Sequence, residues 1–285
     1  MKRHLLYTCI ALVASGVAAA CGDGGGTSNG PDTGVPNDPP VTVGNWYRPA
    51  VSATWQWQLS GTVNTAYNVS LYDIDLFDSP TNLIASLQQA GHRVICYFSA
   101  GSYENWRPDA AQYPAAALGK KLGGWAGERW VDIRSTDVHN ILSARLDLAV
   151  QKGCDGVEPD NVDGYTNNSG FSLSAQNQLD FNAFLANAAH YRGLSVGLKN
   201  DLDQVVALVD YFDFSVNEQC HQYNECDLLT PFTSNSKPVF NAEYASAYVT
   251  NASARQALCT DAQARNVRTL ILPLDLDDSF RLTCD

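Results

Sequence analysis

Eight short runs rich in apolar, β-branched and aromatic residues recur along this chain, and most of them are separated by stretches with helical spacing. Strands that alternate with helices are typical of repeated βαβ units, and eight of them favour a closed barrel over an open sheet. We therefore predict a single (β/α)8 TIM-type barrel of the α/β class. The predicted strands are residues 55–59, 69–74, 93–98, 156–160, 195–199, 212–217, 238–243 and 268–273.

The predicted helices are residues 82–90, 138–151, 175–189, 201–209 and 252–265, and residues 130–133 fall in a long third βα loop at 99–136. The chain of 285 residues is long enough for one barrel and too short for a second domain of ordinary size. No glycine-rich nucleotide-binding motif follows a predicted strand. The formal net charge of -12 would repel phosphate backbones, so we expect no nucleic-acid partner. We also expect a monomeric protein.

The first residues have the layout of a secretory signal. Lys2 and Arg3 precede an apolar run at 5–13, and small residues at 17–20 end at Cys21. We read residues 1–20 as a signal peptide. The cysteine resembles that of a bacterial lipobox, in which it becomes the lipidated first residue of the mature protein; simple secretion with cleavage nearby is the alternative.

The apolar run is too short to span a bilayer as a helix, so a lipid anchor would be the protein's one attachment to a membrane. Residues 21–43 are rich in Gly and Pro and almost free of large apolar side chains, which predicts a flexible tether. The catalytic barrel then covers residues 44–285. We expect an exported protein, held at a bacterial membrane or cell surface if lipidated and secreted otherwise.

Six cysteines lie in the predicted barrel, and an even number in an exported protein favours disulfides, although six allow 15 connectivities. Cys220 with Cys226 and Cys259 with Cys284 are two candidate pairs. Cys96 falls in an apolar strand, where a buried free thiol is an equal alternative. The spacings do not match a structural zinc site.

Polar side chains gather after the predicted strands, at the end of the barrel where working residues lie. Strand alternation places Glu158 and Asp160 on one face of the fourth strand, and Glu218 on the same face as Phe214 and Val216 of the sixth. Asp160 and Glu218 could therefore face each other across the barrel mouth. Two such carboxylates are what cleavage of a glycosidic bond requires. Each acid taken alone could instead be a helix cap or an ion-pair partner.

Several sequence blocks resemble the endo-α-1,4-polygalactosaminidase family of glycoside hydrolases, in the right order from about residue 46 to the C-terminus. The blocks are TWQWQLSG, YDIDLFD, VICYFSAGSYENWRPD, ERWVDIR, GVEPDNVDGY, SVGLKNDLDQ, FDFSVNEQC and FNAEY. The resemblance implies a (β/α)8 barrel that cuts polymers of α-1,4-linked galactosamine or N-acetylgalactosamine internally. It also implies Asp160 and Glu218 as the catalytic pair.

The remaining polar and aromatic residues at the barrel mouth are candidates for substrate binding, because acids suit free amines and aromatic faces suit sugar rings. They are Asp73, Asp75, Tyr97, Lys199, Asn200, Glu243, Tyr165 and Trp106. We expect no cofactor and no metal. The two alternatives are a non-catalytic polysaccharide-binding barrel on the cell surface, and a divalent-metal enzyme, since clustered carboxylates also suit calcium or magnesium.

Overall fold

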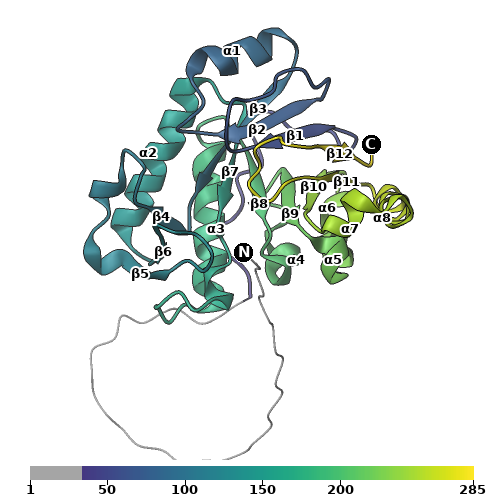
Figure 1. Cartoon of the computed structure of the whole chain (residues 1–285). Coiled ribbons are helices and arrows are strands. Elements are labelled where there is room, and N and C mark those ends of the chain that lie inside the picture. The colour runs from purple at the N-terminus through teal and green to yellow at the C-terminus, as the bar shows by residue number, and fades with distance from the viewer. Residues whose placement is uncertain (1–33) are drawn as a thin grey trace, which may run out of the picture.

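The computed structural model describes residues 34–285, which form one curled sheet surrounded by helices (Figure 1). The sheet has the order β1-β2-β3-β7-β8-β9-β10-β11-β12, and the pairs from β1 to β11 are parallel, whereas β12 is antiparallel to β11. The strands are β1 (Trp55–Gln58), β2 (Leu71–Asp75), β3 (Arg93–Ser99), β7 (Gly156–Asp160), β8 (Ser195–Lys199), β9 (Phe214–Glu218), β10 (Val239–Glu243), β11 (Val267–Ile271) and β12 (Leu282–Thr283). The eight parallel strands overlap the eight predicted ones.

The sheet curls until its two ends meet. The ring of Trp55 in β1 lies 5.1 Å from that of Phe240 in β10, although the two strands are far apart in the sheet order. The Trp55 indole donates to the Arg268 carbonyl at 3.1 Å, and the Arg281 guanidinium donates to the Trp55 carbonyl at 2.9 Å. These bonds bridge the seam between β1 and the β11–β12 edge, and the predicted barrel fold is confirmed.

Helices cover the outside of the barrel, and a large apolar cluster fills the layer between them and the sheet (Figure 1). The longer helices are α1 (Thr81–Gln89), α2 (Thr136–Lys152), α3 (Ala175–His190) and α8 (Ala252–Ala264). The predicted helix at 201–209 is a short 3-10 turn, η4 (Leu202–Gln204), followed by α4 (Val205–Leu208). The remaining helices are short: η1 (Ala110–Gln112), η2 (Ala115–Ala117), η3 (Gly164–Thr166), α5 (Cys220–Tyr223), η5 (Cys226–Leu229), α6 (Thr230–Ser234) and α7 (Ser246–Thr250).

The long loop between β3 and α2 contains a second, smaller sheet. Its strands β4 (Ser102–Glu104), β6 (Glu128–Val131) and β5 (Leu118–Lys121) pair antiparallel in the order β4-β6-β5. Sequence analysis placed this region in a loop and did not predict the sheet. We call residues 100–131, which contain it, the insert.

The described part of the predicted tether is attached to the barrel. Asn37 bonds to the Asp180 carboxylate through its backbone N–H at 2.8 Å, and His190 Nδ1 of α3 bonds to the Val41 carbonyl at 2.8 Å. Residues 34–43 therefore pack on α3, because their backbone polar groups find partners there. The predicted signal peptide (1–20), the lipidation site Cys21 and the rest of the tether lie outside the described residues. No helix within 34–285 is both long and apolar enough to cross a membrane.

Three disulfides link Cys96 to Cys154, Cys220 to Cys226 and Cys259 to Cys284. The second and third pairs confirm the two predicted from the sequence. The free-thiol alternative for Cys96 is wrong, because Cys154 lies against the outer face of β3 and forms a disulfide with it.

Candidate active site

A cavity of about 820 Å³ opens at the carboxyl ends of the parallel strands. One wall is the insert, and the opposite wall is the loop after β11. The cavity lining includes most of the predicted site: Asp75, Tyr97, Trp106, Asp160, Lys199, Asn200 and Glu218. This is the position at which a barrel gathers side chains from several strands, so the geometry of these residues decides what the site can do.

Strand alternation directs the two predicted catalytic acids inward. On β9, Phe214 and Val216 belong to the apolar cluster of the barrel interior, and Glu218 follows them on the same face. On β7, Val157 belongs to the outer cluster, so Asp160 points into the barrel. Gly156 lies below Asp160 on that inner face, where an added Cβ would come within 2.8 Å of the Ser195 side chain.

Lys199 at the end of β8 joins the two acids. Its ammonium nitrogen lies 3.1 Å from Asp160 Oδ1 and 3.5 Å from Glu218 Oε2. Because both oxygens contact the same nitrogen, the two carboxylates lie close together. Their separation is in the range that glycosidases use to flank one glycosidic bond. The Lys199 side chain is 2% exposed, whereas those of Asp160 and Glu218 are 19% and 27% exposed. The lysine therefore lies beneath the acids, and the acids face the cavity.

The charge of Lys199 is stabilised by its neighbours. Burial disfavours the ammonium form, but Asp160, Glu218 and Glu158 outweigh that effect and raise the pKa of Lys199 well above its usual range. The ammonium also lies 4.8 Å from the ring centre of Trp57, which adds a cation–π contact. A permanently charged lysine under two carboxylates reduces their mutual repulsion, so both can be held close together.

Two tyrosines fix the outer oxygens of the acids. The Tyr97 hydroxyl donates to Asp160 Oδ2 at 2.9 Å, and the Tyr244 hydroxyl donates to Glu218 Oε1 at 2.6 Å. Burial, followed by the neighbouring carboxylates, raises the pKa of both tyrosines well above the usual value. Each phenol consequently keeps its proton and acts as a fixed donor.

The strands β7, β8 and β9 each end in a left-handed backbone turn. Asn161, Asn200 and Gln219 follow Asp160, Lys199 and Glu218 directly, with φ values of 61°, 49° and 66°. Residues other than glycine rarely adopt this conformation, and at functional sites the surrounding structure holds it in place. Here the Asn161 N–H donates to Asp160 at 2.7 Å, and the Glu218 N–H donates to Asn200 Oδ1 at 3.0 Å. The turns therefore orient the acids.

Asp73 and Glu158 form a buried carboxyl pair near the Lys199 ammonium. Neither is among the residues that line the cavity, and their side chains are shielded from solvent. Burial, and then the charge of Glu158, raises the pKa of Asp73 well above its usual value. Glu158 in turn lies 3.2 Å from the Lys199 ammonium. Asp73, predicted from the sequence to bind substrate, is buried outside the cavity lining.

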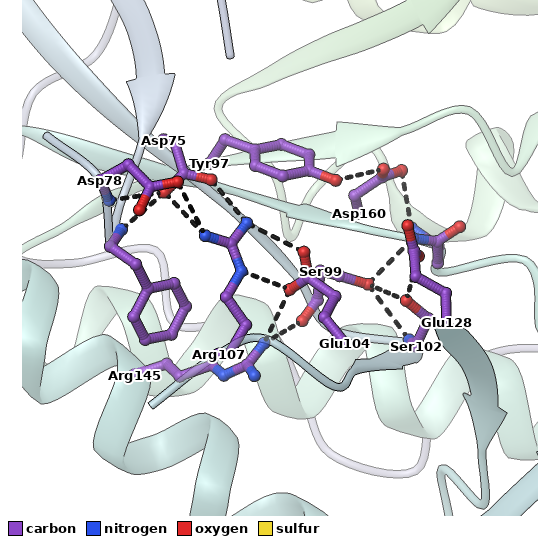
Figure 2. Close-up of polar contacts among 12 residues, drawn as sticks. Asp75, Asp78, Tyr97, Ser99, Ser102, Glu104, Arg107, Glu128, Arg145 and Asp160 are labelled. Carbon is purple, nitrogen blue, oxygen red and sulfur yellow. Dashed lines mark hydrogen bonds and ion pairs between the residues drawn. The ribbon is translucent and has the colours of Figure 1, made fainter. Parts of the chain in front are cut away.

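Asp75 is part of an ion-pair network between the barrel and the insert (Figure 2). Its carboxylate lies 2.6 Å from Arg107, and it accepts backbone N–H groups from Phe77 and Asp78, each at 2.8 Å. Arg107 also pairs with Glu104 at 2.9 Å. Although Asp75 touches the cavity, its oxygens are engaged in fixing the insert to the barrel.

The structure places two other predicted binding residues outside the cavity lining. Glu243 points to the outer face of β10, where its Oε1 accepts the His221 N–H at 2.9 Å, because Phe240 and Ala242 occupy the inner face. Tyr165 lies on η3 and is half-buried; it is not itself a lining residue, although its neighbours Asp163 and Thr166 are.

Sequence analysis did not single out Glu128, which lines the cavity from β6 of the insert. The β-strand pattern around residues 128–131 was the signal in the sequence that could have found it.

The chain is similar to known proteins of solved structure. The chain is 45% identical to Ega3 of Aspergillus fumigatus, a structure in complex with galactosamine, with a TM-score of 0.80 over 85% of this chain and 99% of that one. The fold is also similar to the glycoside hydrolase domain of PelA from Pseudomonas aeruginosa, at 12% identity and a TM-score of 0.63 over 79% of this chain and 96% of that one. No curated protein sequence matches the chain significantly.

The family model for glycoside hydrolase family GH114 matches residues 37–285, which include the whole barrel, the insert and the cavity. The identity to Ega3 extends over most of both chains. The resemblance to the endo-α-1,4-polygalactosaminidase family that the sequence blocks indicate is thus confirmed, and this chain is a glycoside hydrolase that belongs to family GH114.

Proposed function

We propose that this protein cleaves internal bonds of α-1,4-linked galactosamine or N-acetylgalactosamine polymers, with Asp160 and Glu218 as the catalytic pair. The observation that carries the proposal is the convergence of both carboxylates on the Lys199 ammonium at the floor of the cavity, at 3.1 Å and 3.5 Å. Galactosamine in the Ega3 structure supports the sugar class.

The contacts suggest a division of roles. Asp160 is held from three directions, by Tyr97, Lys199 and the Asn161 N–H, which is the fixed orientation that a nucleophile requires. Glu218 accepts the Tyr244 hydroxyl at 2.6 Å, but its contacts to Lys199 and Asn200 are longer, at 3.5 Å and 3.4 Å, and it is the more exposed acid. We assign Asp160 as nucleophile and Glu218 as the acid that protonates the leaving oxygen. Water then releases the sugar with Glu218 acting as base.

The cavity suits a chain rather than a single sugar end. Trp106 lines it from the insert and is 51% exposed, which leaves its ring accessible for stacking on a sugar ring. Leu274 lines the opposite wall and is 40% exposed. A polymer lying between these walls would present an internal linkage to the two acids.

We also propose that the protein is exported and anchored through Cys21. The support is the signal-like layout of residues 1–21 together with three disulfides, which form and persist in oxidising compartments. Radiolabelled palmitate should appear in the expressed protein, and Cys21→Ser should abolish the label. Labelling of the Cys21→Ser protein at the unmodified level would contradict the anchor.

Digestion of defined oligomers of galactosamine and of N-acetylgalactosamine tests the enzymatic proposal. Mass spectrometry should show internal fragments first, and NMR should show the product with retained anomeric configuration, because a nucleophile is used. A chelator should leave the rate unchanged, since neither role needs a metal. Binding of both oligomers without any cleavage would favour the non-catalytic polysaccharide-binding alternative.

A further inference from the structure

Glu128 lines the cavity from β6 and has one unused carboxylate oxygen. The residue is 8% exposed, and its Oε2 accepts the Ser102 hydroxyl at 2.8 Å. Within residues 34–285 no hydrogen bond or ion pair engages its Oε1. A buried carboxylate is costly unless a charged partner compensates it, so this oxygen is a site for a cationic group of a ligand.

The neighbouring Glu104 differs from Glu128 because arginine side chains compensate its negative charge. Glu104 of β4 pairs directly with Glu128 of β6 in the sheet register. Arg107 lies 2.9 Å from one Glu104 oxygen, and Arg145 lies 3.9 Å from the other. Figure 2 shows both arginines on the Glu104 side of the network and Glu128 beyond Ser102. The insert therefore carries two facing acids that both line the cavity. Arginines of the fold neutralise Glu104, whereas no ion pair within residues 34–285 neutralises Glu128.

A short chain of contacts connects Glu128 to the catalytic centre. Ser102 lies 2.7 Å from Ser99 through their hydroxyls, and the Asn161 side chain donates to Ser99 at 2.9 Å. The Asn161 N–H in turn donates to Asp160. Glu128 and Asp160 thus belong to one hydrogen-bonded network, and both line the cavity in which the sugar would lie.

We propose that Glu128 recognises the ammonium group of a deacetylated galactosamine unit and so selects deacetylated stretches of the polymer, an inference that rests on the proposed function. The ammonium would donate to Oε1 and supply the missing positive charge. An N-acetyl group offers no charge to this oxygen and is bulkier. The residue is therefore a determinant of specificity and takes no part in breaking the bond.

The charges around Glu128 give this recognition a pH dependence. Burial raises the pKa of Glu128 to about 7; Glu104 and Asp160 add to the increase, and the Ser102 hydrogen bond and Arg107 oppose it. A bound ammonium lowers this pKa, so binding is strong above the free value and weakens as pH falls below about 7. Acetylated sugar should show no such contribution.

Calorimetric binding to the inactive Glu218→Gln protein tests the inference without requiring cleavage. The probes are a galactosamine tetramer and its fully N-acetylated form. Adding Glu128→Gln keeps the shape of the side chain. It should weaken the binding of the deacetylated tetramer about tenfold or more, and the binding of the acetylated tetramer less than about twofold. It should also flatten the fall in affinity of the deacetylated tetramer below pH 7.

Asp147→Asn in the same Glu218→Gln background is the matched control, since it removes one exposed acid on α2, outside the cavity lining. It should weaken the binding of the deacetylated tetramer less than about twofold, because a solvated charge contributes little to affinity. Equal loss for both tetramers, or no loss for either, on adding Glu128→Gln would overturn the inference. Hydrolysis by the unmodified protein tests the proposed function separately.

Discussion

At the scale of single residues, Lys199 explains how several acids can share one barrel mouth. Three carboxylates, from Glu158, Asp160 and Glu218, lie within 3.5 Å of its ammonium nitrogen. Without a cation these groups would repel one another and bind protons. The Lys199 ammonium offsets the repulsion between Asp160 and Glu218 and bridges them from below, and it also lies 3.2 Å from Glu158 of the buried Asp73–Glu158 pair.

Asparagine and glutamine variants of the two acids test their roles. Asp160→Asn and Glu218→Gln keep the size of the side chain and remove the nucleophile or the transferable proton. We expect each to lower kcat by about 10²- to 10⁴-fold on galactosamine oligomers. Thermal melts should change little, because both side chains are partly exposed at the cavity.

Asp147→Asn is the control, because this acid is 67% exposed on α2 and pairs with Arg192 at the surface. It should retain the unmodified rate. Turnover near the unmodified level in either Asp160→Asn or Glu218→Gln would show that another group performs the chemistry.

At the scale of the elements, strand alternation accounts for what the sequence could predict. The inner faces of β7 and β9 carry Asp160 and Glu218 as expected, since period 2 depends on the local chain alone. The same period, applied to β10, puts Phe240, Ala242 and Tyr244 inside and Glu243 outside. Glu243 was assigned to the pocket from its place at a strand end, which does not specify a face.

The insert escaped prediction for a different reason. Its strands have only 3 to 4 residues, and β5 is partly exposed along its length, so they lack the buried run that marks a barrel strand. The function of Glu128 depends on the insert folding over the barrel mouth. That arrangement rests on contacts such as Arg107 with Asp75, which join residues distant in sequence.

The turn from β3 into β4 offers a test of how the insert is held. The Gly101 N–H donates to the Asp160 carbonyl at 3.0 Å, and a Cβ at Gly101 would lie 1.7 Å from the Asn161 carbonyl oxygen. Gly101→Ala must therefore move backbone next to the nucleophile. We expect a loss of about 1–3 kcal/mol in the free energy of unfolding and a fall in kcat of at least about tenfold.

Gly123→Ala serves as the comparison, since an added Cβ there meets nothing within 4 Å. Urea denaturation and kinetics on the same oligomer should separate the two variants. If Gly101→Ala retained both the stability and the kcat of the unmodified protein, the turn would not be what positions Asp160.

At the scale of the whole molecule, the disulfides close loops of very different length. The pairs are separated by 58 residues for Cys96–Cys154, 25 for Cys259–Cys284 and 6 for Cys220–Cys226. The cysteine count predicted that pairs form, and proximity suggested the two shorter ones. The longest could not be deduced, because it depends on β3 and β7 becoming neighbours in the sheet.

Replacing each pair by alanine should destabilise the protein in the order of loop length. The chain entropy that each disulfide removes from the unfolded state predicts how far its loss lowers the free energy of unfolding. The values are about 4 kcal/mol for Cys96–Cys154, about 3.5 kcal/mol for Cys259–Cys284 and about 2 kcal/mol for Cys220–Cys226. Burial of Cys96 adds a packing loss to the first value and so preserves the order. Guanidinium denaturation of the three double variants measures these differences. The order would be contradicted if removing Cys220–Cys226 lowered the free energy of unfolding most. In that case the contacts that this disulfide holds beside β9, which ends at Glu218, would matter more than loop closure.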